Sequence, residues 1–160
     1  MAKKPLIYIS GALTAQDPEH GKLLRAMYER VAEVCGELGF EPYLPHKISD
    51  PILHQDLTPE QVDDIDRAAV CSSILVIAFG DVPAIGVGIE IEMAKHAGKP
   101  VILVYSHKLF EKKLISRLAR ANVINVAYHD FYKDGLAQIG KEIAAVIKKM
   151  KRLPRPLQAF

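Results

Sequence analysis

Short, continuous apolar runs constrain the fold of this chain most strongly. Ile74–Phe79 and Val101–Tyr105 are apolar at nearly every position, and Leu6–Ile9 is a shorter run of the same kind. Strands that are apolar on both faces are typical of a parallel sheet covered by helices on both sides. Weaker strand patterns at Phe40–Leu44 and Val123–Ala127 bring the expected number of strands to five.

Between the strand patterns, apolar residues recur every three or four positions, which is typical of amphipathic helices. One of these helices has a clear start signal, because Thr58 can cap, Pro59 suits the first helical position and Gln61 completes a capping box. The predicted helices cover residues 24–38, 58–71, 87–97, 109–120 and 136–150. Alternating strands and helices predict a single α/β domain over residues 1–150, with a tail at residues 151–160. The expected architecture is a flavodoxin-like (Rossmann-like) five-stranded parallel sheet of order 2-1-3-4-5, with helices on both faces.

Composition and charge exclude several classes of protein. With 160 residues, 49% of them hydrophobic and 25% charged, the chain has the make-up of a globular domain. No apolar run approaches the roughly 18 residues of a membrane span, and no targeting segment is recognised, so we expect a cytoplasmic protein with no membrane partner. Residues 106–160 carry 12 Lys and Arg against 4 Asp and Glu, but the basic cluster at 148–152 suits a helix end. We therefore expect no nucleic-acid partner. Cys35 and Cys71 lack metal-ligand spacing and are expected to be buried thiols.

Three segments meet at the carboxyl edge of the predicted sheet, where ligands bind in folds of this class. The turn after the first strand brings Tyr8 and the segment Ser10–Ala12, in which Gly11 either admits a ligand or only shapes the turn. The helix from Thr58 brings Asp66, an acid within an apolar stripe, which is costly unless the carboxylate is paired or used.

The third segment runs from Asp81 to Glu90 and follows a buried strand. We expect Glu90 in the first turn of a helix, where the dipole favours the anion. An ionised carboxylate at this edge can attack an electrophilic carbon, as glycosidase nucleophiles do; the alternative is a favourable surface residue. The glycines at 86 and 88 match neither a dinucleotide fingerprint nor a P-loop, so no cofactor is expected. His46 is expected at the pocket mouth, and the histidines and acids of that loop lack the spacing of a metal site.

Taken together, Tyr8-Ile-Ser-Gly11, Asp66 and Gly86-Val-Gly-Ile-Glu90 resemble the nucleoside 2-deoxyribosyltransferase family, in order and spacing over residues 5–127. The closer branch is that of the 2′-deoxynucleoside 5′-monophosphate N-hydrolases. The resemblance implies that Glu90 is the nucleophile, that Asp66 helps the base to leave, and that Tyr8 orients Glu90. It implies hydrolysis of the N-glycosidic bond of a (deoxy)nucleoside 5′-monophosphate through a covalent glutamyl intermediate. The alternatives are base exchange between deoxyribonucleosides and a non-catalytic nucleotide-binding module.

The same resemblance implies a set of substrate-binding residues and a partner. The binding residues are Ser10, Gly11, Ala12, Thr14, His46, Ala84, Gly86, Gly88 and Ser116. Two of these depart from the family pattern, because Ala84 stands where the hydrolases have serine and the transferases aspartate, and Thr14 stands in place of an arginine. Backbone amides near the glycines are then expected to hold the phosphate. The resemblance also implies a homodimer with a shared active site, in which Ser116, with help from Arg117, reaches the neighbouring subunit.

Overall fold

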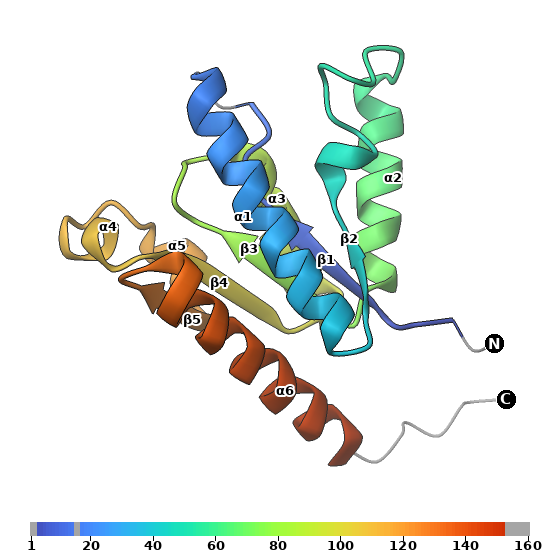
Figure 1. Cartoon of the computed structure of the whole chain (residues 1–160). Coiled ribbons are helices and arrows are strands. Elements are labelled where there is room, and N and C mark those ends of the chain that lie inside the picture. Colours follow the sequence, from blue (N-terminus) through green and yellow to red (C-terminus); the bar gives the residue numbers. More distant parts are fainter. Residues whose placement is uncertain (1–2, 15–16, 153–160) are drawn as a thin grey trace, which may run out of the picture.

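The computed structural model describes residues 3–14 and 17–152 of the chain, which form a five-stranded parallel sheet with helices around it (Figure 1). The strands are β1 (Leu6–Ser10), β2 (Glu41–Tyr43), β3 (Leu75–Phe79), β4 (Val101–Ser106) and β5 (Ile124–Tyr128). The helices are α1 (Pro18–Glu37), α2 (Pro59–Ser72), α3 (Ile85–His96), α4 (His107–Glu111), α5 (Arg117–Arg120) and α6 (Leu136–Arg152), with single turns η1 (Pro45–Lys47) and η2 (Phe131–Gly135). The strand order is β2-β1-β3-β4-β5, so the predicted fold class and topology are confirmed.

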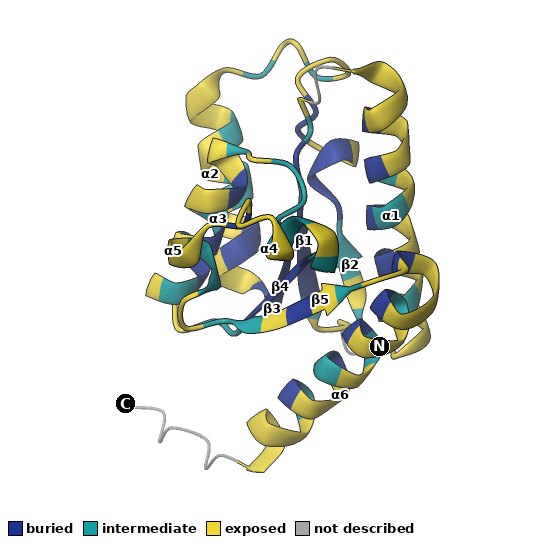
Figure 2. Ribbon diagram, turned by 90° about the vertical axis from the view of Figure 1, so that its left-hand side faces the viewer, coloured by how far each residue is buried: buried dark blue, intermediate teal, exposed yellow. Residues whose placement is uncertain are grey.

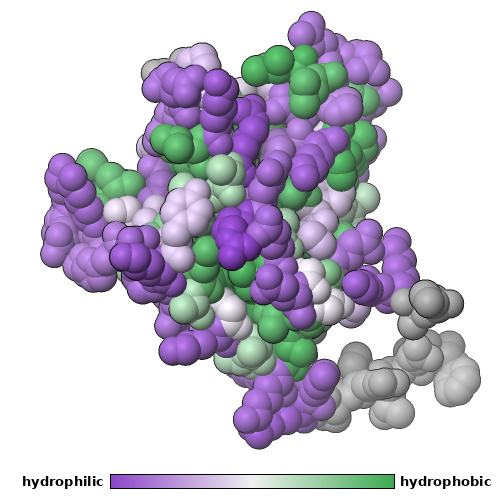
Figure 3. Space-filling model, in the orientation of Figure 1, coloured by the Kyte–Doolittle hydropathy of each residue, from purple (hydrophilic) through white to green (hydrophobic). Residues whose placement is uncertain are grey.

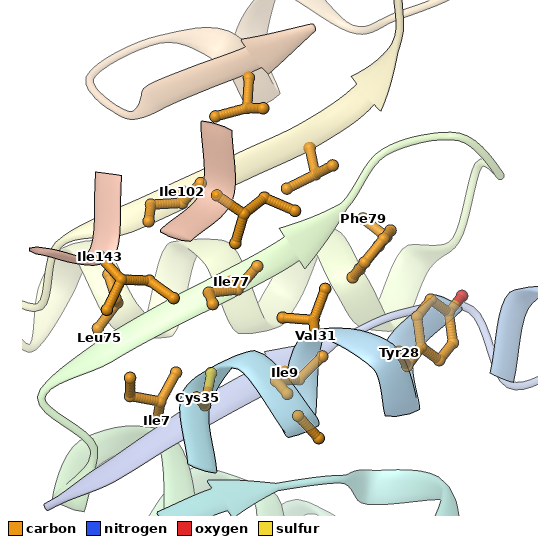
Figure 4. Close-up of a cluster of buried hydrophobic side chains, with 14 of the residues drawn as sticks. Ile7, Ile9, Tyr28, Val31, Cys35, Leu75, Ile77, Phe79, Ile102 and Ile143 are labelled. Carbon is orange, nitrogen blue, oxygen red and sulfur yellow. The ribbon is translucent and has the colours of Figure 1, made fainter. Parts of the chain in front are cut away.

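The central strands β1, β3 and β4 are buried on both faces, and successive residues of these strands belong to different layers. One layer joins the sheet to α1 and α6; Figure 4 shows part of it, with Ile7 and Ile9 of β1 beside Val31 and Cys35 of α1. The other layer joins the sheet to α2 and α3 and contains Tyr8. Figure 2 shows the buried strands between helices whose outer faces are exposed. Side chains of β1 therefore alternate between a purely structural layer and the layer of α2 and α3.

The prediction of a single helix over residues 109–120 is wrong. Two short helices, α4 and α5, stand there, and Lys113 between them has a left-handed backbone with φ of 60°. Ser116 caps the second helix by accepting a hydrogen bond from the Ala119 amide at 3.3 Å. Ile115 is buried against the α3 layer while Leu114 is exposed. The break therefore turns one apolar side chain inward and starts a new helix at a serine.

Several predicted boundaries and one burial prediction also change. Helix α1 begins at Pro18 because Asp17 caps it, and α3 begins at Ile85, two residues earlier than predicted. Helix α6 continues to Arg152, two residues into the predicted tail, and residues 153–160 lie outside the described residues. Cys71 is exposed rather than buried. None of the helices in the described ranges is both long and apolar enough to cross a membrane.

Candidate active site

Glu90 lies on α3 and is held by two side chains of β1. The Tyr8 hydroxyl donates a hydrogen bond to Glu90 Oε1 at 2.7 Å, and the Ser10 hydroxyl donates to Oε2. Tyr8 and Ser10 are two residues apart on one strand, so both point toward the layer of α2 and α3. Both oxygens of the carboxylate are thereby fixed at the carboxyl end of the strand.

Burial, rather than the helix dipole, dominates the electrostatics of Glu90. Because α3 begins at Ile85, Glu90 is in the second helical turn, and the expectation of a first-turn carboxylate is wrong. Desolvation by burial raises the pKa of Glu90, against the lowering effect of the Ser10 and Tyr8 hydrogen bonds, and the charge of Asp66 raises it further. Burial and the neighbouring Glu90 also raise the pKa of Tyr8, so its hydroxyl is a permanent donor at neutral pH.

Asp66 lies on α2 and is bonded by two residues that the sequence reasoning missed. The Tyr43 hydroxyl is 3.5 Å from Asp66 Oδ1, and the Ser49 hydroxyl is 3.3 Å from each carboxylate oxygen. Burial raises the pKa of Asp66, and the hydrogen bonds from Ser49 and Tyr43 oppose that rise. The predicted strand order placed the strand of Tyr43 beside the strand of Tyr8, but only the observed register pairs the two tyrosines. Ser49 lies in a loop without periodicity and had no such signal.

Both acids line one cavity of about 800 Å³ at the carboxyl edge of the sheet. Five of the predicted binding residues line it with them: Gly11, Ala12, Thr14, Ala84 and Gly86. Tyr8 and Ser10 are fully buried and reach the site through Glu90. The structure therefore brings together residues from three separate segments of the chain, as the topology predicted.

Three predicted binding residues lie elsewhere. His46 does not line this cavity; it is buried, with Nε2 at 3.2 Å from Glu29 Oε1 and its ring against Tyr28. His46 is a buried residue of the single turn η1. His54, later in the same loop, lines the cavity instead. Gly88 and Ser116 line a second cavity. The Gly88 amide donates within α3 to the Ala84 carbonyl at 3.2 Å, so it is not available to a phosphate.

Gly11 is required by a neighbouring ring rather than by a turn. A Cβ at this position would stand 2.2 Å from Cζ of Tyr28, far inside van der Waals contact. The Tyr28 hydroxyl donates to the Ala12 carbonyl at 3.2 Å, which holds the ring against the loop. The contact with Tyr28 is a third reason for a glycine here, beside the two that the sequence suggested, and Gly11 also lines the cavity.

An ion pair connects two walls of the cavity. The Arg25 guanidinium donates to the Leu13 carbonyl at 3.2 Å and to Asp50 Oδ2 at 3.0 Å. Asp50 is buried and also accepts from the Ile52 amide at 2.8 Å. Arg25 therefore ties the loop after β1 to the loop before α2, whose hydrophobic surface is visible at the top of Figure 3. No Lys or Arg is among the described residues that line the cavity.

A second cavity, of about 860 Å³, lies between α3 and the segment of α5. Its rim carries large apolar side chains that are strongly exposed, with Ile85 at 86% and Leu118 at 80%. Ile89 and Leu114, also exposed, complete this apolar rim. Ser116, which lines this cavity, is exposed. In the described part of the chain, no three His, Cys, Asp or Glu side chains converge as a metal site would require.

Comparisons with known proteins place the fold. No family model matches the chain, and no curated protein matches its sequence. Among solved structures, the CMP N-glycosidase BcmB of Clostridium botulinum is 22% identical, with a TM-score of 0.62 over 86% of this chain and 98% of that one. BlsM is 20% identical, with a TM-score of 0.70 over 98% and 99% of the two chains. A 2-deoxyribosyltransferase from Leishmania mexicana is 13% identical, with a TM-score of 0.54 over 84% and 97%. The predicted resemblance to the nucleoside 2-deoxyribosyltransferases is therefore confirmed at the level of the fold, which this chain shares along most of its length.

Proposed function

We propose that this protein is an N-glycosidase that hydrolyses a (deoxy)nucleoside 5′-monophosphate to the free base and a sugar 5-phosphate. The observation that carries the proposal is the pair of half-buried acids, Glu90 and Asp66, in one cavity, with both oxygens of Glu90 held by donors. A carboxylate fixed in this way suits a nucleophile, and a second acid with a raised pKa suits proton transfer. The fold shared with a structure described as a CMP N-glycosidase supports the same chemistry.

The reaction proceeds in two steps. Glu90 attacks C1′ as the bond from C1′ to the base nitrogen breaks; the electron pair leaves with the base, and Asp66 supplies or positions the proton that neutralises it. Positive charge on the sugar in this transition state favours the anionic form of Glu90. Water then attacks C1′ of the ester, loses a proton to Asp66, and releases the sugar phosphate and the Glu90 carboxylate. Tyr8 and Ser10 keep the attacking oxygens in place throughout.

The phosphate needs donors that the cavity only partly contains. The amide of Gly86 is one, because it lies in the first turn of α3, where backbone N–H groups have no helical partner. Ala84 supplies no side-chain donor, and no Lys or Arg is among the described residues that line the cavity. We propose that a second copy of the chain covers the apolar rim of the second cavity and brings Ser116 and Arg117 to the phosphate.

Chromatography of the free base tests the activity. Nucleosides and their 5′-monophosphates, deoxy and ribo, are incubated with the protein, with and without an acceptor base. We expect base release without acceptor, faster from monophosphates than from nucleosides, and loss of release in Glu90→Gln. Turnover only with acceptor would replace hydrolysis by base exchange, the activity named for the Leishmania structure. Binding without any turnover would leave a nucleotide-binding module, and full activity in Glu90→Gln would refute the mechanism.

The oligomeric state is tested separately by light scattering. Leu118→Glu places a charge on the apolar rim, and Tyr132→Glu is the matched control, since Tyr132 is 56% exposed and does not line that cavity. We expect a dimer for the wild type and the control, and a monomer with weakened turnover of monophosphates for Leu118→Glu. A wild-type monomer with full activity would refute the shared site.

A further inference from the structure

A stacked pair of tyrosines links the two acids of the cavity. Tyr8 and Tyr43 are register partners on the neighbouring parallel strands β1 and β2. Their ring centroids are 5.1 Å apart with an interplanar angle of 16°. One hydroxyl bonds Glu90 on α3, and the other lies at 3.5 Å from Asp66 on α2. The strand register therefore ties together two carboxylates that stand on separate helices.

Ser49 completes the surroundings of Asp66. It is 4% exposed, and its hydroxyl lies 3.3 Å from both oxygens of the Asp66 carboxylate and 3.4 Å from the Pro45 carbonyl. A buried hydroxyl between two acceptors at these distances has few other partners for its proton. Asp66 is thus bonded from β2 by Tyr43 and from the loop before α2 by Ser49.

We propose that Tyr43 and Ser49 are the positioning residues of Asp66, and that the Tyr8–Tyr43 stack sets the separation between this acid and the nucleophile Glu90. The kinetic part of this inference rests on the proposed function; the structural part does not. Neither residue is needed to build the sheet through its hydroxyl, since a phenylalanine would stack at position 43 and an alanine would fit at position 49. The role of the two hydroxyls is therefore to hydrogen-bond the Asp66 carboxylate.

The charges around Asp66 give the direction of the effect. Burial and the charge of Asp63, one helical turn earlier, raise the pKa of Asp66, and the Ser49 and Tyr43 hydroxyls lower it. Glu90 on α3 and Tyr8 on β1 are coupled to the same carboxylate. A donated hydrogen bond favours the charged form, so loss of either hydroxyl raises the pKa of Asp66. Because Glu90 and Asp66 interact, their titrations are coupled, and a Glu90→Gln background removes this coupling.

The structural test is a titration of carboxyl-labelled aspartates by NMR in Glu90→Gln protein. We expect Ser49→Ala to move the Asp66 titration to higher pH and Tyr43→Phe to move it in the same direction by less, because its contact is longer and single. Tyr105→Phe is the matched control, since it removes a hydroxyl bonded to Asn125 at 3.2 Å on another part of the sheet. Shifts no larger than those of this control would overturn the inference.

The kinetic test uses chains that retain Glu90. We expect Tyr43→Phe and Ser49→Ala to lower kcat roughly tenfold with little change in KM. We also expect both variants to move the limb of the pH–rate profile that reports Asp66 to higher pH. Tyr43→Leu, which also removes the stack, is expected to lose more than Tyr43→Phe. A normal kcat with an unshifted profile would overturn the inference even if the NMR titration moved. If the wild type releases no base from any substrate, the proposed function fails, and the NMR titration alone decides whether Tyr43 and Ser49 hold Asp66.

Discussion

Replacing Gly86 by alanine separates two reasons for a glycine at the start of α3. A Cβ at Gly86 would meet no atom within 4 Å, and the same is true of Gly36 in α1. The backbone of the free protein therefore needs neither glycine. Alanine in place of a helical glycine stabilises a protein by about 0.4–1 kcal/mol. Since 1 kcal/mol moves Tm by about 2–4 °C in a chain of this size, both variants are expected to melt about 1–4 °C higher.

Activity is expected to distinguish the two variants. Gly86 lines the cavity of the two acids, and Gly36 does not. If the sugar approaches the backbone at the start of α3, the added methyl of Gly86→Ala occupies that space, and kcat/KM falls at least about tenfold, or 1.4 kcal/mol. Thermal melting by circular dichroism and initial rates of base release measure both effects. A Gly86→Ala protein with wild-type kcat/KM would refute the close approach, and a lowered Tm would refute the open surroundings.

Three further perturbations test the acids, a helix start and the loop after β1. Because the pKa of Glu90 is raised in the folded state, its carboxyl group ionises at lower pH in the unfolded chain than in the folded one. The free energy of unfolding therefore falls as the pH rises from the ordinary glutamate range to the raised pKa. The Tm gain of Glu90→Gln over wild type should thus be larger at pH 7 than at pH 4; an equal gain at both would contradict this. Thr58→Ala removes the capping box of α2 and is expected to cost about 1 kcal/mol in urea unfolding, whereas Thr58→Ser should be near neutral. Gly11→Ala pushes Cβ into Tyr28 and is expected to cost about 1–3 kcal/mol, less in a Tyr28→Leu background; additive costs would argue against that contact.

The fold, Glu90 and Asp66 could be predicted from the sequence because buried segments have recognisable local patterns of apolar residues. Continuous apolar runs identified the strands, and Asp66 was conspicuous within an apolar stripe. The start of α3 was misplaced because Ala84 at its N-cap makes no side-chain hydrogen bond, and so leaves no capping signal. That error of two residues placed Glu90 in the first turn of the helix, whereas the structure has it in the second turn, where burial rather than the helix dipole dominates its electrostatics.

Other parts of the site depend on contacts between distant segments. The break at Lys113 needs a left-handed residue that helical periodicity does not reveal. The inward turn of His46 depends on Glu29, 17 residues earlier in the chain. The partners of Asp66 come from a strand and a loop whose neighbours are known only once the register is fixed.

The segment at the start of α3 separates the two cavities, and Pro83, Ala84, Ile85 and Val87 line both of them. Any displacement of this shared segment therefore changes the shape of both cavities. If a ligand in the first cavity displaces this segment and changes the affinity of the second cavity for the second copy of the chain proposed above, that copy must change the affinity for the ligand by the same factor. Under the proposed dimer, substrate would then shift the monomer–dimer equilibrium, and a change in protein concentration would shift the apparent substrate affinity.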